Sequence, residues 1–482
     1  MFQKMKHLLI LLGCFFFWTH SKEVSIPFHI SQVIHVIEEI ENKLLVSSAV
    51  KITELLRKIG KQDNAYYQHL LGDVLVSDAE LSFLTKEQTE FLKYVMQHEV
   101  KSTSEYGVVL TRDGTSVATS PLILGLAAGL KRQTNMPLSV INQDLAGTVD
   151  NILSATLTKD LGLSYLLSHI NQSTAALGSH GCWNNISYPN VFTLLEVSPS
   201  FTDAFVNGGF DGVILGNYLS ENKDHALKIS SVMREYYNEN GQTGQAQLKS
   251  NFRQQNFAHF IRNYDMREQV KNSLYLYKHL SQDPVFQPSD NNIIDLISEK
   301  DMEEFQRVYL ECPAIIPRCM WEAKPFIGTP TPLKLPLGFV YIHHTYEPSK
   351  PCRTFPECAA DMRSMQRFHQ EDRGWQDIGY NFVVGSDGYL YEGRGWLIQG
   401  AHTKGNNEKG YGVSFIGDYT SALPESFALE LVKESFLKCA VKGLNIVSNF
   451  TIHGHRQLVN TSCPGEKLYQ LIKTWPGFKE VH

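Results

Sequence analysis

Apolar residues recur at helical spacing through the first two thirds of the chain. The spacing is clear between Ile30 and Leu44, and it returns at Leu92–Met96 and at Phe252–Ile261. Apolar residues at positions i, i+3 and i+4 lie on one face of a helix. The pattern therefore predicts a mainly helical N-terminal domain over 22–309, where neither a repeat nor a catalytic motif is evident.

The pattern changes near residue 310, where short apolar runs alternate with glycine turns. Gly338–Thr345 and 412–416 are predicted strands, and Tyr380–Val384 with Tyr389–Glu392 form a predicted hairpin around the turn at 386–388. Helical patterns separate these strands, at 358–370, 424–441 and 465–475. Strands interleaved with helices predict an α/β domain with a central mixed sheet flanked by helices over 310–482.

The first residues have the features of a signal peptide. Lys4 and Lys6 precede an uncharged apolar run from Leu8 to Trp18, and Ser21 follows near a suitable cleavage point. This order predicts a signal peptide over 1–21 and a secreted, extracellular protein. The alternative is a buried first helix. A second apolar run at Pro121–Leu130 is too short to cross a membrane, so we expect a buried segment there and no transmembrane segment.

Length and charge narrow the possibilities further. A chain of 482 residues exceeds the roughly 250–300 residues at which single cores stop growing, which favours two domains. The net charge is −6 and no long Lys/Arg run is present, so we expect no nucleic-acid partner. Secretion favours disulfides among the 8 cysteines. Asn171, Asn185, Asn449 and Asn460 each begin a glycosylation sequon.

Histidine and cysteine residues of the last third could hold a catalytic zinc ion. Such a site has three protein ligands and an open position, where bound water becomes a nucleophile near neutral pH. His343 and His344 are adjacent on a strand, so only one of them can enter a given site. His455 and Cys463 are joined by a loop that could fold back onto one metal. Spacing alone leaves the alternative open, in which Cys463 belongs to a disulfide and the histidines are structural. The full candidate set is His343, His344, His402, Cys439, His453, His455 and Cys463.

Four ordered motifs resemble the peptidoglycan-recognition protein family, whose members are relatives of phage-type zinc amidases. The motifs are YIHHT at 341–345, GWQDIGYNFVVGSDGYLYEGRGW at 374–396, GAH at 400–402 and GHRQL…SCPG at 454–465. The resemblance covers about 310–478, and the long N-terminal extension is similar to that of the long secreted members. It implies the zinc-amidase fold and an N-acetylmuramoyl-L-alanine amidase that acts on bacterial peptidoglycan and muramyl peptides in innate immune defence. The alternative is a receptor that binds peptidoglycan without cutting it.

The resemblance also assigns roles to individual residues. His343, His455 and Cys463 are implied ligands of Zn²⁺, and Tyr380 is implied to lie beside the open position. Thr461 stands where the phage enzymes carry a catalytic lysine, and it is the least specific of these assignments. Family members that only bind peptidoglycan typically lack the cysteine at the position of Cys463. Its presence here favours an enzyme over a receptor.

Other residues of these motifs have two interpretations each. Arg394 and Trp396 are candidates for lining the peptidoglycan cleft, with a structural turn as the equal alternative. His402 is a candidate for a substrate contact or for a hydrogen bond behind a metal ligand. The resemblance implies the disulfides Cys352–Cys358 and Cys312–Cys439, and it leaves Cys182 and Cys319 as a possible further pair.

The sequon at Asn460 lies between two of the implied metal ligands, His455 and Cys463. A glycan there would stand beside the active site, so we predict that Asn460 is not glycosylated. Mass spectrometry of glycopeptides from the secreted protein tests this. A glycan on Asn460 in a fully active sample would contradict the prediction.

Overall fold

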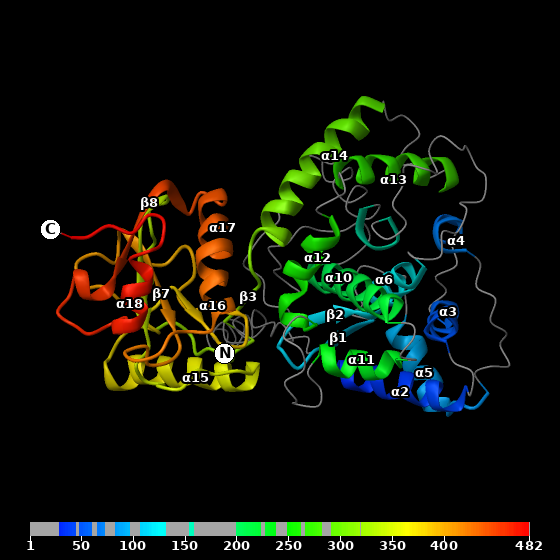
Figure 1. The fold of residues 1–482 in the computed structure, drawn as a ribbon, viewed down its shortest axis with the longest axis horizontal. Coiled ribbons are helices and arrows are strands. Elements are labelled where there is room, and N and C mark those ends of the chain that lie inside the picture. The colour runs from blue at the N-terminus through cyan, green and yellow to red at the C-terminus, as the bar shows by residue number, and fades with distance from the viewer. Residues whose placement is uncertain are drawn as a thin grey trace, which may run out of the picture.

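The computed structural model describes residues 28–44, 48–59, 65–72, 82–96, 107–131, 154–158, 199–222, 227–237, 248–261, 266–281, 291–318 and 320–481. The predicted signal peptide, Asn171, Asn185, Cys182 and Cys319 lie outside these residues. The described residues gather in two regions, each with its own apolar interior (Figure 1).

Helices dominate the described residues before 310, and three of them lie where the apolar spacing predicted them: α2 (Ile30–Lys43), α5 (Lys86–Val95) and α12 (Arg253–Ile261). A short antiparallel hairpin of β1 (Val108–Leu110) and β2 (Ser116–Ala118) was not predicted. The remaining elements are α3 (Ala49–Ile59), α4 (Ala65–Leu71), α6 (Thr119–Lys131), η2 (Ser154–Thr158), α10 (Pro199–Glu221), α11 (Ile229–Tyr236), η4 (Ser250–Phe252), α13 (Met266–Ser281), α14 (Asn291–Phe305) and η6 (Gln306–Leu310).

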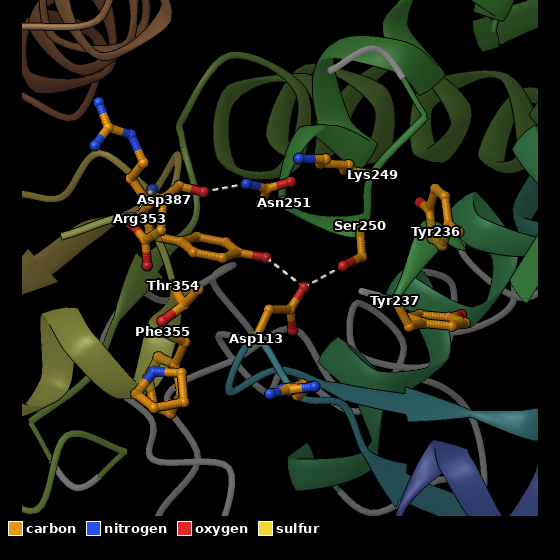
Figure 2. A pocket seen from close by; sticks show the side chains of 13 residues that line it. Asp113, Tyr236, Tyr237, Lys249, Ser250, Asn251, Arg353, Thr354, Phe355 and Asp387 are labelled. Atoms are coloured by element: carbon orange, nitrogen blue, oxygen red, sulfur yellow. Dashed lines mark hydrogen bonds between the residues drawn. The ribbon is translucent and has the colours of Figure 1, made fainter. Parts of the chain in front are cut away.

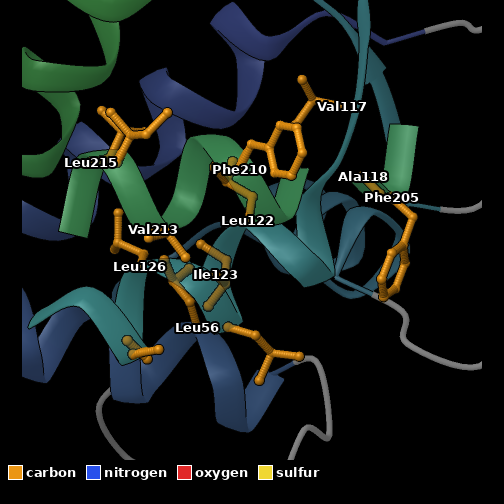
Figure 3. Packing of buried hydrophobic residues seen from close by; sticks show 14 of the residues in the cluster. Leu56, Val117, Ala118, Leu122, Ile123, Leu126, Phe205, Phe210, Val213 and Leu215 are labelled. Carbon is orange, nitrogen blue, oxygen red and sulfur yellow. The ribbon is translucent and has the colours of Figure 1, made fainter. Parts of the chain in front are cut away.

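Helices α6 and α10 pack against each other at the centre of this region (Figure 3). Their facing surfaces carry glycines, which let the two backbones approach closely. A methyl group on Gly212 would lie 2.3 Å from the carbonyl oxygen of Leu122, so no larger residue fits there. The apolar run Pro121–Leu130 is buried within α6, as expected. No helix in the described part of the chain is long and apolar enough to cross a membrane.

A six-stranded mixed sheet forms the centre of the second region, in the order β3-β6-β5-β7-β4-β8. All neighbours are parallel except β5 and β6, which form the predicted antiparallel hairpin. This confirms the mixed sheet that the sequence predicted. The strands are β3 (Ile315–Ile316), β4 (Leu337–His344), β5 (Phe382–Val384), β6 (Leu390–Glu392), β7 (Gly410–Phe415) and β8 (Ile446–Gly454).

Helices cover both faces of the sheet, again as predicted. One face packs Val383 and Tyr391 against α15 (Phe355–Arg367), which continues into η7 (Phe368–Asp372). The opposite face packs Ile342 and Phe382 against the other helices. These are α16 (Ser426–Glu430), η8 (Leu431–Phe436), α17 (Leu437–Lys442) and α18 (Glu466–Ile472).

Two disulfides hold segments of the second region to its sheet and helices. Cys352–Cys358 closes the chain ahead of α15, and Cys312–Cys439 ties the segment that enters the region to α17. Both pairings that the resemblance implied are confirmed. Among the described residues, Cys463 is the free cysteine.

The two regions meet through polar groups at the turn between β5 and β6. The Tyr389 hydroxyl donates to Asp113 Oδ2 at 2.8 Å, and the Asn251 side-chain amide donates to the Asp387 carbonyl oxygen. Figure 2 shows Asp113 also receiving a hydrogen bond from Ser250. Burial opposes the charge on Asp113, but the Arg253 guanidinium and three hydroxyl donors hold the pKa of this carboxyl below its usual value. Tyr389 therefore donates to a charged acceptor in the interior.

Replacing Tyr389 with phenylalanine should weaken this contact while filling the same space. A hydrogen bond to a charged group contributes about 1.5–3 kcal/mol, and Asp113 would lose one of its donors. We expect Tyr389→Phe to lower the free energy of unfolding by about that amount, measured by urea denaturation. Tyr346→Phe removes the hydroxyl of an exposed tyrosine and is the matched control. Equal stability of the two variants would contradict this view of the contact.

Candidate metal centre

The parallel pairing of β4 with β8 brings two histidines to one edge of the sheet. Tyr341 is paired with His453 and Ile342 with Gly454. His343 is the next residue of β4, and His455 follows directly after β8 in the short helix η9 (His455–Gln457). Their ring centroids lie 4.4 Å apart.

The loop after η9 returns Cys463 to the same place. The Arg456 backbone N–H donates to the Cys463 carbonyl at 2.9 Å, and the Cys463 N–H donates to Thr461 Oγ1 at 3.2 Å. These bonds place Cys463 Sγ 3.7 Å from His343 Nδ1. One donor atom from each of His343, His455 and Cys463 lies within 4.8 Å of the others.

This donor set fits a zinc ion. Zinc binds sulfur at about 2.3 Å and nitrogen at about 2.0–2.1 Å in a tetrahedron, so its donor atoms lie roughly 3.3–3.6 Å apart. The separation of Cys463 Sγ from His343 Nδ1 is close to this range. Two imidazoles and a thiolate are the donors of a zinc site rather than of a calcium or magnesium site, and three protein ligands are the number found in catalytic zinc sites.

Burial keeps both imidazoles neutral and so leaves a lone pair for a metal. It lowers the pKa of His455 to about 4, and it lowers the pKa of His343 well below its usual value. Burial also raises the pKa of the Cys463 thiol to about 12, although the His344 backbone N–H donates to the sulfur at 3.4 Å. Because zinc binds the thiolate, metal binding at neutral pH must displace the proton of Cys463.

Tyr380 lies beside this cluster, two residues before β5. Its ring centroid is 5.4 Å from that of His343. Burial, and then the nearby Cys463, raise the pKa of the phenol, so Tyr380 is a protonated donor at neutral pH. Thr461 supports the loop that carries Cys463, because its hydroxyl accepts the Cys463 N–H and keeps its own proton for another acceptor.

Arg394 and Trp396 are structural residues in this fold. The Arg394 guanidinium donates to the carbonyl oxygens of Ile378 at 2.7 Å and Gln399 at 2.9 Å, which ties two loops together. Trp396 is 4% exposed, and its ring packs on Phe382 in the core of the opposite face of the sheet from His343. The prediction that Trp396 lines a cleft is therefore wrong, since its ring fills the core instead.

His402 lies close to the cluster but turns both ring nitrogens toward protein groups. Nδ1 is 3.0 Å from Thr403 Oγ1 and Nε2 is 3.1 Å from Asn381 Oδ1. Thr403 Oγ1 is in turn 3.3 Å from His343 Nε2. This arrangement favours the second interpretation of His402, a hydrogen bond behind a metal ligand.

Several residues of the site escaped the sequence analysis. Thr403 and Asn381 adjoin GAH and DIGY, but their role depends on contacts between strands that spacing does not reveal. His369 stacks on Trp375 with ring centroids 4.6 Å apart and lies 5.9 Å from the Tyr380 ring. Trp375 is 37% exposed, so it forms an accessible aromatic rim beside Tyr380. The feature of the sequence that could have identified Trp375 is its position in the motif that includes Tyr380.

Comparison with known proteins identifies the family to which the chain belongs. Residues 334–466 match the family model described as N-acetylmuramoyl-L-alanine amidase, which places this domain in the amidase class. N-acetylmuramoyl-L-alanine amidase from Mus musculus is 40% identical over 98% of both chains. The Homo sapiens protein of that name is 38% identical over 98% of this chain and 94% of its own. The chain therefore belongs to the N-acetylmuramoyl-L-alanine amidase family.

Other relatives match a shorter part of this chain. Peptidoglycan recognition protein 3 from Homo sapiens is 42% identical over 35% of this chain and 48% of its own. The similarity to the Mus musculus and Homo sapiens amidases, in contrast, extends over the N-terminal helices as well.

Replacing Cys463 with serine should abolish tight zinc binding. A hydroxyl is a poor zinc ligand, and loss of a direct ligand should cost more than the roughly 10–100-fold that follows loss of a supporting group. Zinc affinity measured by competition with a coloured chelator tests this. Ser462→Ala changes the neighbouring exposed side chain and is the control. Unchanged affinity in Cys463→Ser would exclude Cys463 as a ligand.

Proposed function

We propose that this chain is a secreted zinc-dependent amidase of innate immune defence. It hydrolyses the amide bond between N-acetylmuramic acid and L-alanine in bacterial peptidoglycan and in soluble muramyl peptides. The observation that carries the proposal is the convergence of His343, His455, Cys463 and Tyr380 at one edge of the sheet. Family membership supports the activity, because the relatives that match nearly the whole chain bear its name.

Three residues hold the metal in this proposal: His343 through Nδ1, His455 through a ring nitrogen and Cys463 through Sγ. Zinc bound there would supply a water of lowered pKa and would polarise the carbonyl oxygen of the substrate. The neutral state of both imidazoles leaves each ring a lone pair for the metal. The thiolate of Cys463 is stabilised by the N–H of His344, which fixes where the sulfur points.

Tyr380 acts on the substrate. Its phenol keeps its proton at neutral pH, so it donates a hydrogen bond to the carbonyl oxygen as negative charge develops during attack. A donor placed before the reaction begins stabilises that charge without reorganisation. Thr461 holds the Cys463 backbone through its hydroxyl oxygen, and in this proposal its hydroxyl proton orients the scissile carbonyl.

An exposed aromatic group near Tyr380 supports a polymeric substrate. Trp375 is 37% exposed and stacks on His369, whose ring lies 5.9 Å from that of Tyr380, and apolar ring faces bind the faces of sugar rings and peptide methyl groups. Arg394 and Trp396 contribute to the stability of the domain rather than to this surface.

Tyr380→Phe separates catalysis from metal binding. Loss of one donor to a developing oxyanion typically costs about 10²–10³ in kcat. We expect Tyr380→Phe to lose that much amidase activity on a muramyl peptide while it binds zinc as tightly as the wild type. Tyr469→Phe removes a phenol hydroxyl of α18 that donates to Glu480 rather than to a residue of the site, and it should retain full activity.

Chelation of the wild type should abolish activity and added zinc should restore it. The receptor alternative predicts instead that the zinc-loaded wild type binds the muramyl peptide and leaves it intact, an outcome that would refute the amidase proposal.

A further inference from the structure

The side-chain amide of Asn381 has a fixed orientation. Its Nδ2 donates to the carbonyl oxygens of Gly395 at 3.0 Å and Ile398 at 2.9 Å, and its Oδ1 accepts the Gly412 N–H at 3.1 Å. If the amide were flipped, its oxygen would face the two carbonyl oxygens and its NH₂ group would face the Gly412 N–H. Because each unsatisfied buried polar group costs about 1–3 kcal/mol, the flipped form is excluded. Asn381 Oδ1 is therefore an acceptor.

An acceptor at Asn381 fixes which nitrogen of His402 carries the proton. His402 Nε2 lies 3.1 Å from Asn381 Oδ1, so Nε2 must be the donor. A neutral imidazole has one N–H, which leaves Nδ1 as an acceptor. Thr403 Oγ1 lies 3.0 Å from Nδ1 and supplies the proton of that hydrogen bond. The orientation of the Asn381 amide thus determines, through His402, that the Thr403 hydroxyl donates its proton to His402 Nδ1.

Thr403 in turn determines which nitrogen of His343 carries the proton. The Thr403 side chain is fully buried, and a hydroxyl has a single proton, which it gives to His402. The remaining lone pairs of Oγ1 face His343 Nε2 at 3.3 Å, so that nitrogen must donate. His343 Nδ1 then carries no proton, and it is this nitrogen that lies 3.7 Å from Cys463 Sγ.

We infer that Asn381, His402 and Thr403 form a hydrogen-bond relay that sets the tautomer of His343, so that its Nδ1 lone pair faces the metal. They are positioning residues, since none of them touches metal or substrate. The inference rests on the proposed zinc site, and it assigns His402 a role other than substrate binding. Supporting hydrogen bonds to metal-binding histidines orient the ring and raise its basicity.

The surroundings hold the relay rigidly. Asn407 Oδ1 accepts the backbone N–H groups of both His402 and Thr403, at 3.0 and 2.7 Å. The His402 ring fits against two glycines, because a methyl group on Gly412 or Gly400 would lie 2.3 Å from a ring atom. The ring therefore has no space in which to turn and exchange its nitrogens.

Thr403→Val tests the relay, because valine keeps the shape of threonine and removes the hydroxyl. We expect its zinc affinity to fall about 10–100-fold, the range found when a group supporting a metal ligand is lost. Thr403→Ser keeps the hydroxyl and should retain wild-type affinity. Zinc binding is measured by chelator competition on the full chain, so the result does not depend on turnover.

A second measurement reads the tautomer directly. Long-range ¹H–¹⁵N spectra of metal-free protein labelled at histidine nitrogen distinguish the two neutral forms, and His343→Ala identifies the signal. We expect wild-type His343 to be protonated at Nε2 alone and Thr403→Val to show a mixture. Wild-type His343 protonated at Nδ1 would overturn the relay, and this test needs no variant of the relay to fold.

The two measurements also separate this inference from the proposed function. Wild-type protein that binds zinc tightly, together with equal affinity in Thr403→Val, would overturn the relay and leave the zinc amidase standing. Wild-type protein that binds no zinc would refute the zinc amidase, and the His343 tautomer would then decide the relay alone.

Discussion

The candidate metal centre depends on the parallel pairing of β4 with β8. Parallel strands end at the same edge of a sheet, so the end of β4 delivers His343 to the place where the chain leaves β8 at His455. The loop that follows has only to return to the same edge for Cys463 to join them. Because side chains alternate along a strand, a slip of one residue in this register would replace His343 with His344, which faces the other way.

Much of this domain could be predicted from the sequence because its signals are local. Alternation along one strand separated His343 from His344, and turn residues located the β5–β6 hairpin. Strand β8 was missed because Ser448 and Asn449 interrupt its apolar pattern and are exposed in its middle. Trp396 was misplaced because its motif indicates a turn but not which face of the sheet receives the ring. The direction of the hydrogen-bond chain through Thr403 depends on contacts between distant segments, so the spacing of residues along the sequence does not reveal it.

The contact between the two regions combines buried polar groups with an aromatic pair, because Phe252 meets Phe427 edge to face. Arg253 pairs with the buried Asp211 at 3.0 Å and approaches Asp113 at 4.0 Å, and Asp113 receives the Tyr389 hydroxyl. Buried ion pairs contribute little net stability, because desolvation offsets their attraction, but removal of one partner is strongly destabilising. The ion pairs of Arg253 therefore hold Asp113 in place within the helical region, where it receives the Tyr389 hydroxyl from the amidase domain.

The glycine-lined packing of α6 on α10 has a mechanical consequence for that contact. Close-packed interiors have low compressibility and transmit strain, and a direct contact between two backbones has no flexible side chains to deform. Strand β2 runs directly into α6, and the turn before β2 bears Asp113. The turn that meets the amidase domain is thus joined directly to the closely packed α6–α10 pair, so we expect a displacement of α10 to be transmitted to the domain contact.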